Sequence, residues 1–153
     1  MKKKIIICDI DGCLVDTAHL LENCEQLGEN EKWEKFNRNC CNSDNKKNWN
    51  LIEIIDTLDT HLVHKTIFLT TRSASIYKQT YQMLKSMFDF DSFGMAFSLL
   101  MRPADDNTTP SYVIKEGYIK KLKEQFDIVC AIDDDSRNCQ MYKDNGIFTL
   151  QVI

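Results

Sequence analysis

The stretch Ile5-Ile6-Ile7-Cys8-Asp9-Ile10-Asp11-Gly12 determines the expected fold. Its run of β-branched apolar residues is typical of a strand buried on both faces, as in a parallel sheet covered by helices. We expect this strand over Ile5–Ile10, with two aspartates and a glycine at its end. Ligands of such sheets bind beyond the carboxyl ends of the strands. The end of this first strand is therefore the place to look for a functional site.

Further apolar runs continue the pattern along the chain. The other expected strands are Thr66–Thr70, Phe93–Met101, Ile128–Ile132 and Ile147–Ile153. Between them, apolar residues recur at helical spacing. The expected helical stripes are Leu51, Ile54, Ile55, Leu58 and Leu62; Tyr77, Tyr81, Leu84 and Phe88; and Ile114, Tyr118, Leu122 and Phe126. A shorter helix is expected between Ser136 as N-cap and Gly146. The alternation predicts an α/β fold with about five mostly parallel strands and helices on both faces.

Residues 13–50 interrupt this alternation, because they contain no convincing strand. The apolar residues that suggest two helices there are Leu14, Ala18 and Leu21, then Trp33, Phe36 and Cys40. A polar loop is expected over Asn42–Asn50. The segment is too short to fold as a separate domain. We therefore expect residues 1–153 to form a single domain, with 13–50 as a small helical lid over the end of the first strand.

Composition and charge narrow the class of protein. The chain has 153 residues, with 19 basic and 23 acidic side chains and a net charge of −4, which argues against coating long nucleic acid through a broad basic surface. Its apolar runs are shorter than the roughly 20 residues that a membrane helix needs. Asp9 and Asp11 interrupt the basic, apolar start that imitates a signal peptide. We expect a cytoplasmic protein without membrane contact and without a stable protein partner.

The sequence has seven cysteines, an odd number, without a Cys-x-x-Cys motif. This pattern argues against a structural zinc site and favours reduced thiols that act as small apolar residues. Cys40-Cys41 is the one pair to watch for oxidation.

Polar residues also follow the other expected strands and one helix start. The residues at these points are Asp9, Asp11 and Gly12; Thr70, Thr71 and Arg72; Lys115; and Asp133, Asp134 and Asp135. If the sheet is parallel, they meet at one edge. Several carboxylates together need a cation, and ligation by oxygen alone suits Mg²⁺. A lysine and a hydroxyl are suitable donors to a phosphoryl group, and a carboxylate can attack it as a nucleophile. The cluster predicts phosphoryl chemistry with magnesium.

The order of these motifs resembles that of the haloacid dehalogenase (HAD) superfamily. The matching strings are Ile-Cys-Asp9-Ile-Asp11-Gly12, Phe-Leu-Thr70-Thr71-Arg72, Lys115 and Ala-Ile-Asp133-Asp134. The resemblance implies a Rossmann-like HAD fold and an aspartyl-phosphate mechanism. It implies Asp9 as nucleophile, Asp11 as general acid and base, Thr70 as phosphoryl contact and Lys115 as support for both. The implied Mg²⁺ ligands are Asp9, Asp11, Asp133 and Asp134, and the expected substrate-binding residues are Gly12, Thr71, Arg72 and Arg102.

A narrower resemblance concerns substrate. Phe126–Asp134, followed by Met141-Tyr142 and Gly146, resembles the last third of the 3′-phosphatase domain of phage polynucleotide kinase and its stand-alone relatives. Trp33-x-x-Phe36 and Met101-Arg102-Pro103 are also similar to that group. The resemblance implies removal of a 3′-phosphate from a nucleic-acid end or a nucleotide, as in nucleic-acid repair. Arg102 is the expected contact to the neighbouring phosphate.

The chain departs from the pattern in two ways. Ser111 stands where the family usually has an aspartate before the lysine, so Asp105 or Asp106 is expected to orient Lys115. No glycine precedes a lysine in these 153 residues, so the phosphate-binding loop of a kinase is missing. Six basic residues are interpreted either as a local cationic rim of the site or as scattered solubilising charges, and both interpretations stay open. They are Lys46, Lys47, Arg102, Lys120, Lys121 and Lys123.

Other functions stay open at this point. A 5′-nucleotidase or a phosphatase of small metabolites would use the same residues. A receiver domain also gathers acidic residues, a threonine and a lysine, but its lysine comes after the accepting aspartate and the acidic pair comes first. A non-catalytic HAD-like binding module is expected to have lost Asp9, Asp11 or Lys115, and all three are present.

Overall fold

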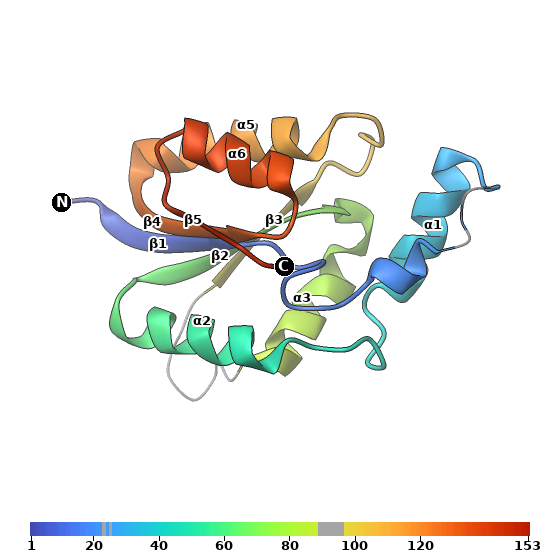
Figure 1. Ribbon diagram of the computed structural model, residues 1–153, viewed down its shortest axis with the longest axis horizontal. Coiled ribbons are helices and arrows are strands. Elements are labelled where there is room, and N and C mark those ends of the chain that lie inside the picture. The colour runs from blue at the N-terminus through green and yellow to red at the C-terminus, as the bar shows by residue number, and fades with distance from the viewer. Residues whose placement is uncertain (23, 25, 89–96) are drawn as a thin grey trace.

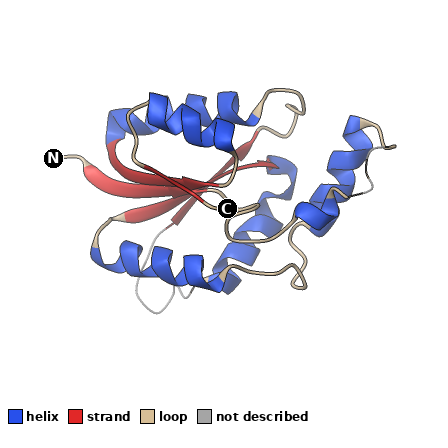
Figure 2. Ribbon diagram, viewed as in Figure 1, coloured by secondary structure: helices blue, strands red, loops and turns tan. Residues whose placement is uncertain are grey.

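The computed structural model describes residues 1–22, 24, 26–88 and 97–153. Within these, one five-stranded sheet has the spatial order β3-β2-β1-β4-β5, and every neighbouring pair is parallel (Figures 1 and 2). The strands are β1 (Lys3–Cys8), β2 (Lys65–Ser73), β3 (Phe97–Arg102), β4 (Phe126–Asp133) and β5 (Thr149–Gln151). The predicted five-stranded parallel sheet is confirmed.

Helices cover both faces of this sheet. The helices are α1 (Glu29–Asn39), α2 (Trp49–His61), α3 (Tyr77–Met87), α5 (Ser111–Gln125) and α6 (Ser136–Asp144), with single 3₁₀ turns at η1 (Ala18–Leu20) and η2 (Ala74–Ile76). In Figure 1, α5 and α6 lie on one face and α2 and α3 on the other, whereas α1 lies to one side of the sheet. The α/β architecture with two covered faces is therefore as expected.

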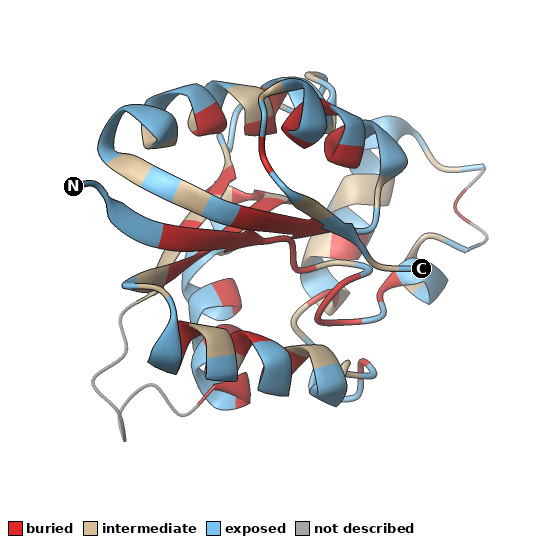
Figure 3. Ribbon diagram, turned by 60° about the vertical axis from the view of Figure 1, so that its left-hand side comes forward, coloured by how far each residue is buried: buried red, intermediate tan, exposed pale blue. Residues whose placement is uncertain are grey.

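The first strand shows why its sequence is apolar throughout. Ile5 and Ile7 pack into the cluster under α5 and α6, and Ile6 and Cys8 pack into the cluster over α2 and α3. Successive side chains of a strand point to opposite faces, so a central strand between two helical layers needs apolar residues at every position. Figure 3 shows buried residues concentrated along the strands and on the helix faces turned toward them.

Several element boundaries differ from the expected ones. Phe126 starts β4 instead of extending the preceding helix, because its backbone is already extended (φ −125°, ψ 157°). Asp135, not Ser136, caps α6, and its carboxylate accepts a hydrogen bond from the backbone N–H of Arg137. Gly146 has φ 72°, the left-handed conformation expected just after that helix. The last strand is shorter than expected, and residues 93–96 of the expected third strand lie outside the described residues.

The buried face of α3 also differs from the predicted stripe. Thr80, Met83 and Leu84 are buried, whereas Tyr77 and Tyr81 are 46% and 37% exposed. The two tyrosine rings stack on each other with centroids 6.1 Å apart, and Tyr81 stacks on Phe97 at the edge of the sheet. Aromatic side chains at helical spacing indicate one shared side of a helix, but not which side is buried.

The two ends of the insertion, residues 13–50, are hydrogen-bonded to each other. Val15 forms an antiparallel bridge with Lys47, and the N–H of Asn48 donates to the carbonyl of Leu14 over 2.9 Å. The first predicted helix of the insertion is wrong, because the chain makes only the 3₁₀ turn η1 there. The second is α1, with Cys40 as its C-cap. The polar loop ends at Asn48, whose side chain caps α2 by accepting from Leu51.

Among the described residues, no helix is both long and apolar enough to span a membrane.

Candidate active site

The predicted polar cluster lies at the carboxyl edge of the sheet, beside a cavity of about 650 Å³. The sheet residues that line this cavity are Asp9, Asp11 and Gly12 after β1; Thr71, Arg72 and Ser73 in β2; Arg102 in β3; and Asp134 after β4. The insertion contributes Trp33 and Phe36 from α1, among others. Parallel strands bring their ends to the same edge, so residues that are distant in the sequence meet here.

Asp9 is held firmly at the end of β1. Its N–H donates to the carbonyl of Ile132 over 2.9 Å, which continues the pairing of β1 with β4. Its Oδ1 accepts from the N–H of Ile10 over 2.7 Å, and its Oδ2 lies 2.8 Å from Nζ of Lys115. Burial raises the pKa of Asp9 to about 7, and the charge of Asp133 adds to the rise, whereas Lys115 opposes it. A positive charge near Asp9 therefore favours its ionised form.

Lys115 joins the two acidic strand ends from the first turns of α5. Its fully buried Nζ lies 2.8 Å from Asp9 Oδ2 and 2.6 Å from Asp133 Oδ2. Burial alone lowers the pKa of Lys115, but the charge of Asp9, followed by Tyr142 and Asp133, raises it well above the ordinary value. The side chain is therefore a cation held between two carboxylates.

The expected orientation of Lys115 by Asp105 or Asp106 is wrong. Asp106 instead accepts hydrogen bonds from the N–H groups of Thr108 and Thr109 and organises the loop that precedes α5. Asp105 is exposed. The carboxylates of Asp9 and Asp133 position Lys115 instead.

Three carboxylates form a group that suits a metal ion. Asp9, Asp133 and Asp134 each offer an oxygen atom, and these atoms all lie within 4.8 Å of one another. Asp133 is fixed from behind, because its Oδ1 accepts from the N–H of Asp135 and from Nδ2 of Asn138. Three convergent carboxylate oxygens beside open space fit the needs of Mg²⁺, which takes oxygen ligands and keeps some of its waters.

Gly12 leaves room for this carboxylate group. Its φ of 75° lies in the left-handed region that favours glycine. A Cβ atom at this position would collide with the carboxylate of Asp134. The glycine in the sequence Asp-Ile-Asp-Gly is therefore required both by the turn after β1 and by the approach of Asp134.

Asp11 has different partners from Asp9. Arg72 donates to it twice, from Nε to Oδ2 and from Nη2 to Oδ1, each over 2.8 Å. The hydroxyl of Thr17 donates to Oδ1 over 3.0 Å. The Asp11 carboxylate therefore lies outside the group formed by Asp9, Asp133 and Asp134. Its assignment as a metal ligand stays a prediction.

The remaining predicted residues divide between the cavity wall and the layer behind it. Thr70 is buried, and its hydroxyl accepts from the N–H of Arg72. Its neighbour Thr71 lines the cavity instead. Arg102 also lines the cavity, while its Nε donates to the carbonyl of Thr71 and its Nη1 to the carbonyls of Asp106 and Thr109. Arg102 thus holds the loop before α5 against the end of β2.

Residues 3–153 match the family model of the polynucleotide kinase PNKP phosphatase domain. The chain belongs to this family. It is a HAD-type phosphatase domain of the PNKP kind, as its sequence motifs implied. No curated protein matches it.

Solved structures support the HAD-like fold of this PNKP-type domain. A chain in the structure of the Pnkp1/Rnl/Hen1 RNA repair complex superposes with a TM-score of 0.67 at 19% identity, over 99% of this chain and 42% of that one. A second structure of the Pnkp1/Rnl/Hen1 complex gives the same score and identity, over 46% of its chain. The putative beta-phosphoglucomutase from Thermotoga maritima has a TM-score of 0.59 at 16% identity, over 94% of this chain and 82% of that one. The domain spans less than half of each repair-complex chain.

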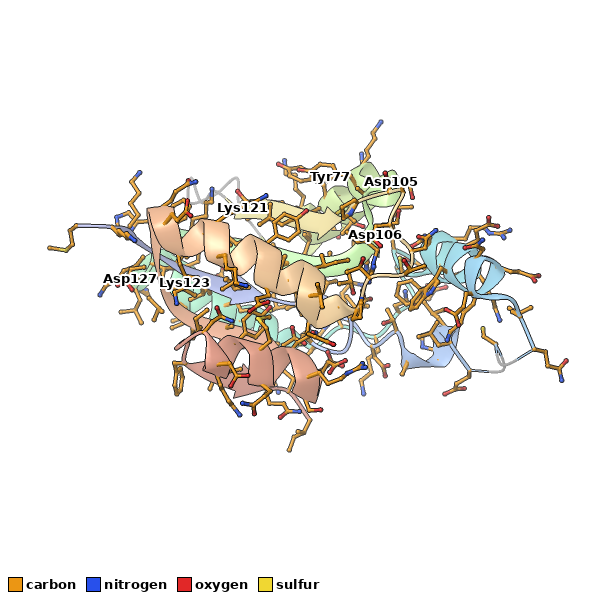
Figure 4. All side chains as sticks on the ribbon, turned by 90° about the horizontal axis from the view of Figure 1, so that it is seen from above. Tyr77, Asp105, Asp106, Lys121, Lys123 and Asp127 are labelled. Atoms are coloured by element: carbon orange, nitrogen blue, oxygen red, sulfur yellow. The ribbon has the colours of Figure 1, made fainter. Side chains whose placement is uncertain are left out.

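A cationic rim of the six candidate residues does not form around the cavity. Of those six residues, Arg102 alone lines it within the described part of the chain. Figure 4 shows Lys121 and Lys123 toward one end of α5, near Asp127, and Asp105 and Asp106 toward the other end. Lys120 pairs with Glu116 on the same helix. Lys47 and Lys123 donate to the carbonyls of Ser43 and Asn145, away from the cavity lining.

Some residues of the PNKP-type site carried no signal in the sequence. Thr17 lies six positions after Asp11 in an irregular segment, yet its buried hydroxyl contacts the Asp11 carboxylate. Asn138 supports Asp133 from α6, and the carbonyl of Cys40 accepts from Arg72 over 3.1 Å. The spacing Asp133 to Asn138 could have indicated a helix that turns back toward the strand end. The other two contacts depend on how the insertion folds.

Proposed function

We propose that this chain is a Mg²⁺-dependent phosphomonoesterase that removes a 3′-phosphate from a nucleic-acid end or a nucleotide through a phosphoaspartate on Asp9. The observation that carries the proposal is the Asp9–Lys115–Asp133 cluster, buried at the wall of a cavity that also contains Asp11. A carboxylate nucleophile, a cation beside it and a second carboxylate facing the same space are the groups that phosphoryl transfer through aspartate requires.

Asp9 is the proposed nucleophile. One of its carboxylate oxygens forms a bond to phosphorus while the ester bond between phosphorus and the leaving oxygen breaks. The N–H of Ile10 and Nζ of Lys115 hold the two carboxylate oxygens in fixed places, so little reorganisation is needed during attack. Lys115 favours the ionised form of Asp9, although burial and the charge of Asp133 still leave the pKa of Asp9 raised to about 7.

Asp11 is the proposed general acid and base. It gives a proton to the leaving oxygen in the first step. It then accepts a proton from the water that attacks the phosphoaspartate, which releases inorganic phosphate and restores Asp9. A well-placed acid–base group contributes on the order of 10²–10⁴-fold to such a reaction. Arg72 and Thr17 orient the ionised carboxylate, the form that the second step requires; the first step requires the protonated form, in which one hydrogen bond from Arg72 is released.

Asp9, Asp133 and Asp134, with Asp11 as the fourth predicted ligand, are the residues that would hold Mg²⁺. The bound ion supplies positive charge that offsets the carboxylates and polarises the phosphoryl oxygens. The convergence of three carboxylate oxygens within 4.8 Å supports this assignment. Asn138 and the N–H of Asp135 hold Asp133 in position from the side away from its other oxygen, which contacts Lys115.

The assignment of substrate rests on the cavity and on the family. Trp33 and Phe36 of the insertion give the cavity an aromatic part of its lining, and Arg102 and Thr109 also line it. A flexible chain end or a nucleotide fits such a partly apolar space, where an aromatic ring can stack on a base. The insertion then acts as a small lid over the reacting phosphate. Belonging to the PNKP phosphatase family supports a 3′-phosphate.

The deciding experiment compares phosphate release from three substrates with Mg²⁺ at fixed ionic strength: a 3′-phosphorylated oligonucleotide, its 5′-phosphorylated isomer and 5′-mononucleotides. We expect the 3′-phosphate to be hydrolysed fastest. Because few phosphates contact the protein, binding should weaken only gradually as salt is added. Much faster hydrolysis of 5′-mononucleotides or of small phosphorylated metabolites would contradict the 3′ assignment and keep the phosphatase assignment.

A further inference from the structure

The two adjacent cysteines at the end of α1 differ in their surroundings from the other five. All seven cysteines are free thiols, and six of them are buried. Cys41 is the exception, since it is partly exposed. Access to solvent is the first condition for a thiol to react with a dissolved oxidant. As a residue, Cys41 is partly exposed, whereas Cys8 and Cys13 beside the site are buried.

The sulfur of Cys41 also has one hydrogen-bond donor, Arg72, and two neighbours that can donate or accept, Thr80 and Cys40. Nη1 of Arg72 donates to it over 3.3 Å, the hydroxyl of Thr80 lies 3.6 Å away, and the sulfur of Cys40 lies 4.0 Å away. These groups stabilise a negative charge on sulfur. The contact with the Cys40 sulfur, followed by Arg72 and Thr80, lowers the pKa of Cys41, whereas partial burial and the charge of Asp11 oppose this. Thiolates, not thiols, are the nucleophiles in cysteine oxidation.

Arg72 connects this sulfur to the proposed acid–base residue. The same guanidinium contacts Cys41 through Nη1 and Asp11 through Nε and Nη2. Its side chain has no exposed surface, and it also contacts the carbonyl of Cys40 and the sulfur of Met83. A close-packed guanidinium cannot make room for an added atom without moving. An atom added to the Cys41 sulfur is therefore expected to shift Arg72 and, with it, the position of Asp11.

We propose that Cys41 is an oxidation site at which a peroxide reversibly lowers the activity of the enzyme by displacing Arg72 from Asp11. The effect on activity rests on the proposed function, whereas the oxidation itself does not. The Cys41 thiolate attacks one oxygen of hydrogen peroxide, the S–O bond forms, and the O–O bond breaks. The sulfur is oxidised by two electrons to a sulfenic acid, and the peroxide leaves as hydroxide, which takes a proton to become water. A thiol reductant returns the sulfur to its original state.

A disulfide between Cys40 and Cys41 is not the expected product. The Cα atoms of adjacent residues are about 3.8 Å apart across a trans peptide, which is shorter than the usual spacing of at least about 4.4 Å between bridged cysteines. Such a bridge would strain the end of α1 and pull the Cys40 carbonyl away from Arg72. We therefore expect sulfenic acid, or its adduct with an added thiol.

The test uses hydrogen peroxide on the full chain, followed by mass spectrometry of the intact protein and of its peptides. We expect the addition of a single oxygen, located on Cys41, and trapping of the product by a reagent specific for sulfenic acids. Cys41→Ser keeps a polar group that can accept from Arg72 and should resist this modification. Cys130→Ser, which removes a buried thiol from β4, is the matched control and should be modified like the unaltered chain.

The second part of the experiment measures phosphate release before and after treatment with peroxide. We expect a loss of about tenfold, which is less than the 10²–10⁴-fold contribution of an acid–base residue because Asp11 is displaced and not removed. The loss should be reversed by dithiothreitol and should be missing in Cys41→Ser, whose activity before peroxide should be unchanged. Modification of another cysteine, a Cys40–Cys41 disulfide or an oxidised Cys41 with full activity would overturn the proposal.

A failure of the proposed function would look different. In that case, the untreated chain releases no phosphate from any ester with Mg²⁺. The peptide masses then still show whether Cys41 is oxidised. The melting temperature shows whether that oxidation displaces Arg72. Displacement of the buried Arg72 should lower the melting temperature of the oxidised chain and leave that of peroxide-treated Cys41→Ser unchanged. An unchanged melting temperature after full oxidation of Cys41 would contradict the link.

Discussion

Arg72 and Asp11 form a planar pair in which two parallel hydrogen bonds of equal length, 2.8 Å, join the guanidinium to the carboxylate. Arg72 comes from β2 and Asp11 follows β1, so the pair connects two neighbouring strand ends. The guanidinium is fully buried, and the Asp11 side chain is 24% exposed on the side of the cavity. Paired hydrogen bonds of this kind fix direction as well as distance. Arg72 therefore determines where the Asp11 carboxylate points.

We predict that Arg72→Met lowers both stability and activity. Breaking a fully buried pair costs about 3–5 kcal/mol, and because Asp11 is partly exposed, the loss should lie at or below the lower end of that range. Activity should fall more for a poor leaving group than for an aryl phosphate, because Asp11 protonates the leaving oxygen. Urea unfolding and kinetics with both substrates measure these effects.

Arg38→Met is the matched control for that substitution. Arg38 pairs with Glu34 on α1, and both side chains are more than 70% exposed. Such surface pairs are worth between zero and about 1 kcal/mol. Equal losses of unfolding free energy in the two variants would show that the buried Arg72–Asp11 pair stabilises the fold no more than a surface pair does.

Asp9→Asn should abolish phosphate release and leave the protein folded. The amide has nearly the same shape as the carboxylate, but it is a poor nucleophile. Incubation with substrate should give no phosphorylated protein, whereas rapid acid quenching of the unaltered chain should trap phosphate on Asp9. Asp44→Asn, an exposed change of the same kind in the insertion, serves as control. A folded and fully active Asp9→Asn variant would refute the assignment of the nucleophile.

Added Mg²⁺ should raise the melting temperature, because an ion that binds the folded state stabilises it by mass action. In Asp134→Asn this rise should be much smaller, since one of the three convergent carboxylates is lost. Excess chelator should stop phosphate release by the unaltered chain. The thermal shift is independent of turnover, so it tests the metal site even if no substrate has been found. An undiminished shift in Asp134→Asn would exclude this residue as a ligand.

Asp59 provides a prediction for the pH dependence of stability away from the site. Burial raises the pKa of Asp59, although the hydroxyl of Thr66 donates to its carboxylate over 2.6 Å and opposes the rise. A carboxyl whose pKa is higher in the folded state favours folding below its unfolded pKa of about 3.9, and this contribution is lost as the pH rises through the folded pKa.

Asp59→Asn should therefore stabilise the protein at neutral pH, because the amide accepts from Thr66 without carrying a buried charge. The advantage should disappear in acid, where Asp59 itself is neutral. Melting temperatures of the variant and the unaltered chain across this pH range check the prediction. A variant that is less stable than the unaltered chain at neutral pH would show that the charged form is favoured by the fold.

The sequence alone determined the architecture of this protein. A strand that is buried on both faces needs apolar residues at every position. Ile5–Cys8 is such a run, because β1 lies in the centre of the sheet between two helical layers. Polar residues after such runs mark strand ends, and in a parallel sheet these ends meet. The order of the motifs then led to the HAD family, and the family model confirmed it. Each of these inferences depends on local pattern and on the general geometry of parallel sheets.

Only the tertiary structure decided which polar groups are partners. The sequence placed Asp9 and Asp11 together, but the fold turns Asp9 toward Lys115 and Asp11 toward Arg72. The contacts of Thr17 with Asp11 and of Cys41 with Arg72 both depend on the path of the insertion. Side-chain pairing depends on distances between elements, and a linear pattern does not encode these distances. The chemistry was therefore visible in the sequence, whereas its electrostatics and the link from Cys41 to Asp11 depend on packing.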